Sequence, residues 1–252
     1  MSSSSSGIFC AYSRYYNLLY RDKDYAGEVE YVDQLLDDSG VPGRQILEFG
    51  SGTGKHGRLL AERGYQVHGI EQSAEMVARA TATEGFTCQV GDICTIQLGR
   101  TYDAVLSLFH VISYQISNTS VQAVFARAAE HLKPAGLFLF DVWYSPAVYA
   151  QGPEARVKRL ADDSVEIVRV AEPVAYPNEN RVDVNYLIFA RDLTVGKYEI
   201  LEETHPMRHF SIPELVMLAQ TAGFELVTVE EFLTGRDPSD STWGVCVVLR
   251  RT

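Results

Sequence analysis

From residue 45 onward, short apolar runs alternate with stretches whose apolar residues recur at helical spacing. This alternation predicts a parallel sheet with right-handed crossover helices on both of its faces. Two further helices are expected before the first strand. The predicted strands are 45–49, 66–70, 87–90, 104–108 and 137–142, and the predicted helices are 12–20, 25–36, 57–63, 74–82 and 121–131.

The pattern changes near residue 165, where three long extended runs follow one another with turn residues between them. Runs of this kind predict antiparallel hairpins. A helix at 212–221, stopped by Gly223, and two strands at 225–233 and 243–249 complete the chain. We therefore expect a helical lid at 1–40, an α/β domain from 41–144 and 211–252, and an antiparallel β insertion at 145–210, which covers the substrate or contacts a second subunit.

Charge and composition exclude several classes of partner. The chain has 33 acidic and 22 basic residues, a net charge of −11, so a polyphosphate surface would be repelled and nucleic acid is not expected as a partner. No apolar stretch is long enough to cross a bilayer, and the first residues lack a signal-peptide pattern, so we expect a cytoplasmic protein. The four cysteines are scattered without a C-x-x-C pair, and we predict no metal site.

The strongest motif is the run from Ile46 to Gly54, in which a buried strand enters a turn with three alternating glycines and a helix follows. Backbone N–H groups and a helix N-terminus would face a ligand there. A phosphate-binding loop is excluded because Lys55 is followed by His56 instead of Ser or Thr. The dinucleotide-binding pattern G-x-G-x-x-G is formally present as Gly52, Gly54 and Gly57, so a nicotinamide-binding oxidoreductase or a nucleotide sensor stays an alternative.

Three acidic residues lie at or near the carboxyl ends of three successive predicted strands. They are Glu48, Glu71 and Asp92. A carboxylate at the position of Glu71 can accept hydrogen bonds from both hydroxyls of a ribose. Glu48 directly precedes the glycines, where it suits a ligand with an ammonium group better than a pyrophosphate.

The run Glu48-Phe-Gly-Ser-Gly-Thr-Gly resembles the first motif of the class I S-adenosylmethionine-dependent methyltransferases. The resemblance covers nearly the whole chain and implies S-adenosylmethionine as cofactor. It also implies a doubly wound seven-stranded sheet of order 3-2-1-4-5-7-6 with the last strand antiparallel. The residues that it assigns to the cofactor are Tyr16, Tyr25, Gly50, Ser51, Gly52, Glu71, Gln72, Met76, Asp92, Ile93 and Leu108.

The acceptor of the methyl group is expected at the carboxyl ends of the fourth and fifth strands. Candidates there are Phe109, His110, Ser113 and Tyr114 after the fourth strand, and Asp141, Trp143 and Tyr144 in or after the fifth.

The tyrosine-rich stretch 12–25 resembles the N-terminal lid of methyltransferases that modify nucleotide-linked deoxyamino sugars. Trp143 and His205 also fall at matching places. One departure is that those enzymes carry a histidine where this chain has Tyr114, and a small polar residue where it has His110. We expect His110 or His205 to act as a base, with Tyr12 and Tyr114 orienting the acceptor. An H-x-x-R pattern adds Arg208 to the acceptor region.

The sequence thus predicts methyl transfer to a hydroxyl or an amine of a small molecule, with a nucleotide-linked sugar as the first choice of acceptor. Another small metabolite or natural product is the alternative within the same class. A monomer or a homodimer is expected.

Overall fold

The computed structural model describes residues 15–252, which divide into two units. One unit, which we call the α/β unit, comprises Asp24–Gln151 and Arg208–Thr252. The other, the β unit, combines the residues before Asp24 with Gly152–Met207. Tyr12, predicted to orient the acceptor, lies outside the described residues.

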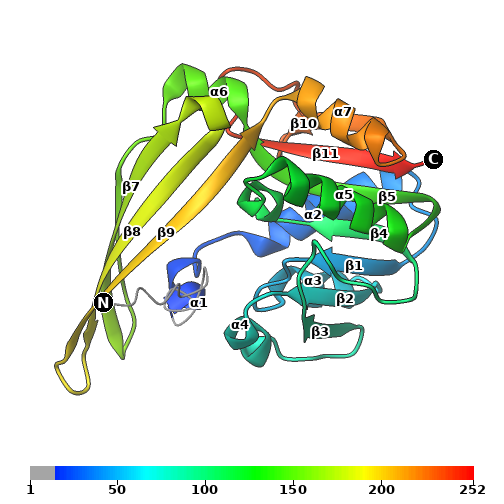
Figure 1. Ribbon diagram of the computed structural model, residues 1–252. Helices are drawn as coiled ribbons and strands as arrows, with labels where there is room; N and C mark the ends of the chain where they lie inside the picture. The colour runs from blue at the N-terminus through cyan, green and yellow to red at the C-terminus, as the bar shows by residue number, and fades with distance from the viewer. Residues whose placement is uncertain (1–14) are drawn as a thin grey trace. The chain divides into compact units, whose positions relative to one another are not determined.

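The α/β unit is built on a sheet whose first five strands are parallel, as expected where helices connect successive strands. Its strands are β1 (Gln45–Phe49), β2 (Gln66–Glu71), β3 (Phe86–Val90), β4 (Tyr102–Ser107), β5 (Leu132–Tyr144), β10 (Phe224–Glu231) and β11 (Gly244–Arg251). Their order across the sheet is β3-β2-β1-β4-β5-β11-β10, with β11 antiparallel to both of its neighbours (Figure 1). The carboxyl ends of β1 to β5 therefore share one edge.

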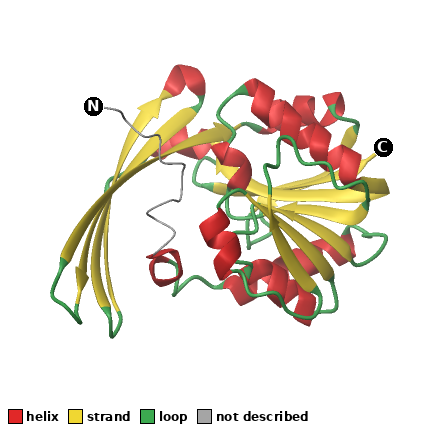
Figure 2. Ribbon diagram, turned by 60° about the horizontal axis from the view of Figure 1, so that its bottom comes forward, coloured by secondary structure: helices red, strands yellow, loops and turns green. Residues whose placement is uncertain are grey.

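Helices cover both faces of this sheet (Figure 2). They are α2 (Tyr25–Asp38), α3 (Lys55–Glu62), α4 (Ala74–Arg79), the 3-10 turn η2 (Val111–Tyr114), α5 (Asn118–His131), α6 (Ser145–Gln151) and α7 (Ile212–Thr221). Side chains alternate along each strand, so β1 sends Ile46 into a core with α2 and α3, whereas Leu47 and Phe49 pack toward α5 and α7. Both cores consist of buried, mostly apolar side chains, so each face of the sheet is covered by packed helices.

The β unit contains α1 (Tyr16–Leu19), β6 (Arg156–Ala161), β7 (Val165–Tyr176), η3 (Pro177–Glu179), β8 (Arg181–Asp192) and most of β9 (Tyr198–Phe210). Strands β6, β7 and β8 form an antiparallel ladder. Leu19 of α1 is fully buried in the small core of this unit, together with Leu160, Ile167 and Ile188. The segment before the first strand therefore packs on a ladder more than 130 residues away in sequence.

The α/β class is confirmed, but the predicted number of strands is wrong. The described residues form eleven hydrogen-bonded strands instead of seven. The insertion supplies β6 to β9, and the last residues of β9 pair with β5 through Trp143↔His209 and Tyr144↔Phe210. β6 was missed because Arg156–Ala161 is largely charged and exposed, without the alternation that marks a half-buried strand.

No helix within residues 15–252 is long and apolar enough to cross a membrane.

Replacement of Phe138 by Ala should destabilise the protein strongly. Its fully buried ring lies 4.7 Å from that of Phe140 and 5.8 Å from that of Phe224, so its loss would leave a cavity between β5, α5 and β10. We expect a loss of about 3–5 kcal/mol in the free energy of unfolding, measured by urea denaturation. Met217→Ala, on the exposed face of α7, is the control and should change it by less than about 0.5 kcal/mol. Equal losses in the two variants would contradict this account of the core.

Candidate functional site

The turn between β1 and α3 is held in a backbone conformation that glycine adopts most readily. Gly50, Gly52 and Gly54 have φ angles of 70°, 54° and 75°, in the left-handed region. The N–H groups of Gly50 and Ser51 donate to the carbonyl oxygen of Ile70 at 2.8 and 3.2 Å. The loop is therefore fixed to the end of β2 before α3 begins.

Glu71 at the end of β2 organises the residues around this loop. One of its buried carboxylate oxygens accepts from the N–H of Gly52 at 2.9 Å, and the other accepts from the N–H of Ser73 at 2.8 Å. Burial raises the pKa of Glu71, while these backbone donors act in the opposite direction. Ser73 in turn caps α4 by accepting from the N–H of Met76.

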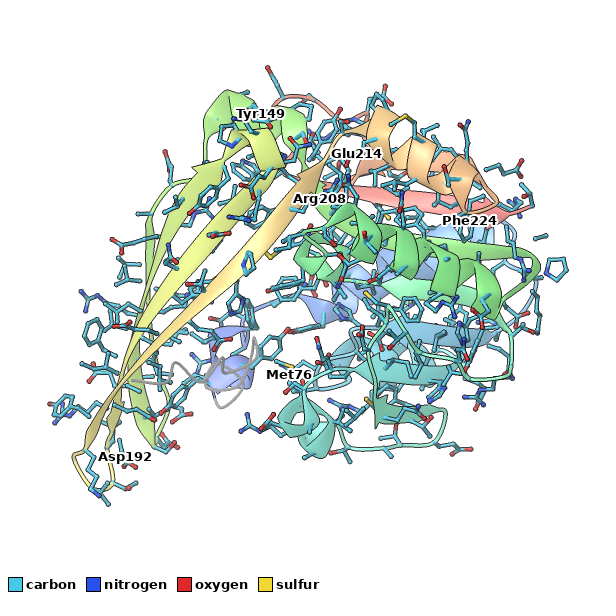
Figure 3. The ribbon with its side chains drawn as sticks, in the orientation of Figure 1. Met76, Tyr149, Asp192, Arg208, Glu214 and Phe224 are labelled. Atoms are coloured by element: carbon cyan, nitrogen blue, oxygen red, sulfur yellow. The ribbon has the colours of Figure 1, made fainter. Side chains whose placement is uncertain are left out.

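Open space adjoins the loop at Gly52. A Cβ built on Gly52 would meet only the sulfur of Met76, at 3.9 Å. Met76 is 2% exposed, and its side chain is labelled in Figure 3. The structure thus brings together five of the predicted cofactor residues, namely Gly50, Ser51, Gly52, Glu71 and Met76.

A second carboxyl group, that of Glu48, is buried directly before the loop. Its Oε2 atom has no hydrogen-bond partner among the described residues. Burial is the main cause that raises its pKa to about 8, Glu71 adds to this effect, and Arg58 opposes it. Glu71 can accept hydrogen bonds from the hydroxyls of a ribose, and Glu48 suits an ammonium donor such as that of S-adenosylmethionine better than it suits a pyrophosphate. The residues present therefore fit this cofactor better than a nicotinamide dinucleotide.

Tyr25 at the start of α2 is held against the first turn of α3. Its ring contacts the edge of His56 at 4.9 Å, and the ammonium of Lys55 lies 4.7 Å above it. His56 pairs with Glu28 of α2 through a buried contact of 2.7 Å. This predicted cofactor residue therefore lies next to the glycine loop, at the amino end of α3.

The other predicted cofactor residues are Asp92, Ile93, Leu108, Gln72 and Tyr16. Asp92 is exposed after β3, and its Oδ1 accepts from the N–H of Cys94 at 2.8 Å. Ile93 and Leu108 are buried in the two cores of the sheet, and Gln72 is exposed. Tyr16 belongs to the β unit, where its ring lies 4.8 Å from that of Tyr20.

A histidine–aspartate pair lies after β4, at the shared edge of the strands. The Nδ1 atom of His110 is 2.7 Å from Oδ2 of Asp141, and its backbone N–H lies 3.2 and 3.3 Å from the two carboxylate oxygens. The Asp141 side chain is 1% exposed, whereas that of His110 is 24% exposed. The pair therefore presents an accessible imidazole on a buried carboxylate.

The backbone at this pair is strained. Phe109 and His110 have φ angles of 66° and 60°, a left-handed conformation that costs a residue with a side chain about 1–2 kcal/mol. Two successive residues of this kind are uncommon outside functional sites.

Aromatic rings lie beside His110. The ring of Trp143 is 6.2 Å from the imidazole, and the ring of Trp243 lies 6.1 Å from that of Trp143 at 89°. Tyr114 is half-buried at the end of η2. The α/β unit thus places the predicted acceptor residues that follow β4 close to those of β5.

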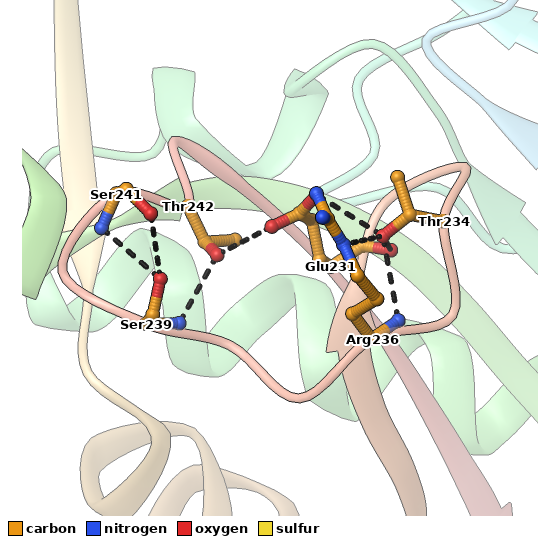
Figure 4. A network of polar contacts seen from close by, with 6 residues as sticks. All are labelled: Glu231, Thr234, Arg236, Ser239, Ser241 and Thr242. Carbon is orange, nitrogen blue, oxygen red and sulfur yellow. Dashed lines mark hydrogen bonds and ion pairs between the residues drawn. The ribbon is translucent and has the colours of Figure 1, made fainter.

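The loop that leads to Trp243 is fixed by a polar network around Glu231 (Figure 4). Glu231 pairs with Arg236 and accepts from Thr234 and Thr242 at 3.0 and 2.7 Å. These donors, with Arg236 first, lower the pKa of Glu231. The carbonyl oxygen of Trp243 then accepts from the N–H of Tyr144 at 2.9 Å.

His205 and Arg208 lie in different units, although only two residues separate them in sequence. In the β unit His205 is 2% exposed, with its Nε2 3.1 Å from Glu203. In the α/β unit Arg208 donates to Asn118 at 2.8 Å and pairs with Glu214 at 2.6 Å (Figure 3). Arg208 therefore ties the end of β9 to α5 and α7, a structural role that the H-x-x-R pattern did not predict.

Among residues 15–252, no group of three His, Cys, Asp or Glu side chains is arranged to hold a metal ion.

Comparisons with known proteins agree with this geometry. Residues 46–136 match the methyltransferase domain family. The chain is 29% identical over 214 residues to dTDP-3-amino-3,4,6-trideoxy-alpha-D-glucopyranose N,N-dimethyltransferase of Streptomyces venezuelae. This alignment covers 83% of this chain and 84% of that protein. It is 26% identical over 223 residues to dTDP-3-amino-3,6-dideoxy-alpha-D-glucopyranose N,N-dimethyltransferase of Streptomyces fradiae, covering 87% and 84%.

The fold also matches a solved structure, that of S-adenosylmethionine-bound CalS10, an amino pentose methyltransferase from Micromonospora echinaspora. The TM-score is 0.77 at 24% identity, and the match covers 99% of this chain and 100% of that one.

Replacement of Gly52 by Val should abolish binding of S-adenosylmethionine, because the side chain would enter the open space beside the loop. Gly40→Val is the matched control, since Gly40 has a φ of 67° and no atom lies within 4 Å of a built Cβ, but it lies after α2. Both variants should lose a similar stability of about 1–2 kcal/mol. Isothermal titration should show wild-type affinity only for the Gly40 variant; undiminished affinity in Gly52→Val would refute the placement of the ligand.

The raised pKa of Glu48 predicts a pH-dependent stability of the ligand-free protein. The folded state holds a proton on this carboxyl up to a pH of about 8, whereas the unfolded chain releases it near 4.5. The folded state binds more protons in this window, so Glu48 makes the protein less stable as pH rises through it. Glu48→Gln should remove this loss of stability. In urea unfolding, the free energy of unfolding of Glu48→Gln minus that of wild type should grow from about pH 5 to about pH 8. Glu62→Gln, on the exposed side of α3, should follow wild type; a constant difference between Glu48→Gln and wild type would contradict the assignment.

Proposed function

We propose that this chain, an S-adenosylmethionine-dependent methyltransferase, methylates the amino group of a nucleotide-linked deoxyamino sugar. The observation that carries the proposal is the reach of the similarity to the Streptomyces venezuelae N,N-dimethyltransferase, whose name specifies such an acceptor. That alignment covers 83% of the chain, and the remainder is shorter than the insertion Gly152–Met207. The similarity therefore includes part of the insertion and extends well beyond the matched residues 46–136.

The cofactor supplies a methyl group on a positively charged sulfur, which a neutral amine can attack directly. The protein must hold the acceptor in line with the methyl group and remove a proton from nitrogen. A protonated amine has no lone pair for the attack, so a base at the carboxyl end of β4 would allow turnover at neutral pH.

His110 is the base that the geometry favours. Asp141 lies 2.7 Å from Nδ1 of His110, without the geometry of a hydrogen bond, and the charge of this carboxylate favours a proton on Nδ1, which leaves the lone pair on Nε2. The ring is partly exposed at the edge where β4 and β5 end, so Nε2 can take a proton from the protonated amine, and the lone pair that this frees on nitrogen can then attack the methyl group. His205, the other predicted base, is almost completely buried next to Glu203, which favours a structural role within the β unit.

The proposal also assigns roles to the N-terminal segment and to the insertion. The tyrosine-rich segment 12–25 would close over the cofactor, and the insertion would cover the sugar. The partner is then a small molecule, and the protein is a cytoplasmic monomer or homodimer.

The proposal is tested by assaying the purified full chain with S-adenosylmethionine and a dTDP-linked deoxyamino sugar. Mass spectrometry should detect methyl groups on the sugar nitrogen. The matched control is the same nucleotide sugar with a hydroxyl in place of the amine, which should remain unmodified. Methylation of the hydroxyl control, or of neither compound in the presence of bound cofactor, would contradict the proposed acceptor.

Replacement of His110 by Ala should slow methyl transfer about 10²-fold at neutral pH under single-turnover conditions, because proton removal then depends on water. The rate should recover as pH rises and the acceptor loses its proton in solution. Asp141→Asn should have a similar effect, since an amide at this position stabilises the wrong tautomer of His110. Wild-type rates in both variants at every pH would show that His110 is not the base.

A further inference from the structure

A pocket of about 260 Å³ opens at the edge of the sheet opposite to the glycine loop. Gln45, Gln66 and Phe86 line it, and these residues begin β1, β2 and β3. The pocket lies wholly within the α/β unit, and no residue of the site described above contributes to it.

One wall of this pocket is a hydrogen-bonded cluster of Arg100, Tyr102 and His68. Arg100 Nε donates to the hydroxyl of Tyr102 at 2.6 Å, and its Nη2 lies 2.6 Å from Nδ1 of His68. The Tyr102 hydroxyl is also 2.7 Å from this Nδ1 atom. A guanidinium only donates, so Nδ1 must be the acceptor and the imidazole must be neutral.

The other ring nitrogen of His68 also has a polar contact, and this contact agrees with a neutral ring that carries its proton on Nε2. Nε2 of His68 lies 3.2 Å from Oε1 of Gln89, and it donates the proton that Nδ1 lacks. Burial, followed by the charge of Arg100, lowers the pKa of His68. The cluster therefore carries one positive charge, which resides on Arg100.

This positive charge is not neutralised by a carboxylate. Arg100 forms no ion pair with any described residue. Although the chain has 33 acidic residues, none of the residues that line the pocket is acidic. Two of the five N–H groups of a guanidinium are used in the contacts to Tyr102 and His68. The other three remain on an exposed side chain at the pocket wall.

We infer that this pocket binds a phosphate group, on an inorganic ion or on a small phosphorylated metabolite. The planar guanidinium of Arg100 matches two phosphate oxygens, and its contacts to Tyr102 and His68 fix its orientation in advance. Gln45, Gln66 and Thr87 would provide neutral donors around the anion. The inference does not depend on the proposed function, because it uses other residues at the opposite edge of the sheet.

The test is isothermal titration of the full chain with inorganic phosphate. Wild type should bind one phosphate, and Arg100→Gln should weaken this binding by at least about tenfold, since the bidentate contact is lost. Thr87→Glu is a second variant, at an exposed position paired with His68 in the β2–β3 register. It adds a negative charge beside the pocket and should weaken phosphate binding to a similar extent. Arg156→Gln removes an exposed arginine of the β unit and should bind like wild type.

A parallel titration with a nucleoside monophosphate separates the two sources of the phosphate. Tighter binding than inorganic phosphate, lost in Arg100→Gln, indicates a phosphorylated metabolite; equal binding of both indicates the free ion. The side-chain nitrogen signals of His68 should shift on addition of either ligand in NMR spectra. No saturable binding by wild type up to about 10 mM phosphate, or unchanged binding in Arg100→Gln and Thr87→Glu, would overturn the inference.

Discussion

The carboxylate of Glu71 is the contact on which the candidate site depends. It accepts one hydrogen bond from the glycine loop and one from the first residue of the next turn, so two segments that follow different strands are fixed by a single group. A loop whose glycines have positive φ angles would otherwise sample many conformations, because glycine has no side chain to restrict it. The buried, parallel strands below make this arrangement possible, since they bring the ends of β1 and β2 to the same edge of the sheet.

Much of this architecture could be predicted from the sequence, and the reasons are local. The buried run into Gly50, Gly52 and Gly54 has few other interpretations, and the apolar periods of α2 and α5 are regular. What could not be predicted depends on contacts between distant residues. The pairing of His110 with Asp141, the role of Arg208 between α5 and α7, and the exposed strand β6 leave no periodic signal. Arg100 was not singled out either, because an isolated arginine in a loop gives no indication that His68 and Tyr102 will contact it.

The division into two units changes how the N-terminal segment is understood. Leu19 is buried among residues of the insertion, so the segment and the insertion stabilise each other although Asp24–Gln151 separates them in sequence. Two segments that pack on each other in this way can diverge as one piece. The glycine loop, the acids beside it and the helices that flank the sheet need not change with them.

The left-handed backbone at Phe109 and His110 also has a consequence for the evolution of the protein. Substitutions to glycine there would relieve strain, and the fold alone would favour them. The chain instead carries two side chains there at the expense of stability, and glycine at position 110 would remove the imidazole that lies 2.7 Å from Asp141. This protein then carries a local stability deficit at the edge where β4 ends, and the buried Asp141 compensates for part of it. Stabilising the chain by design would be easiest at this turn, but glycine at position 110 would also remove the proposed base.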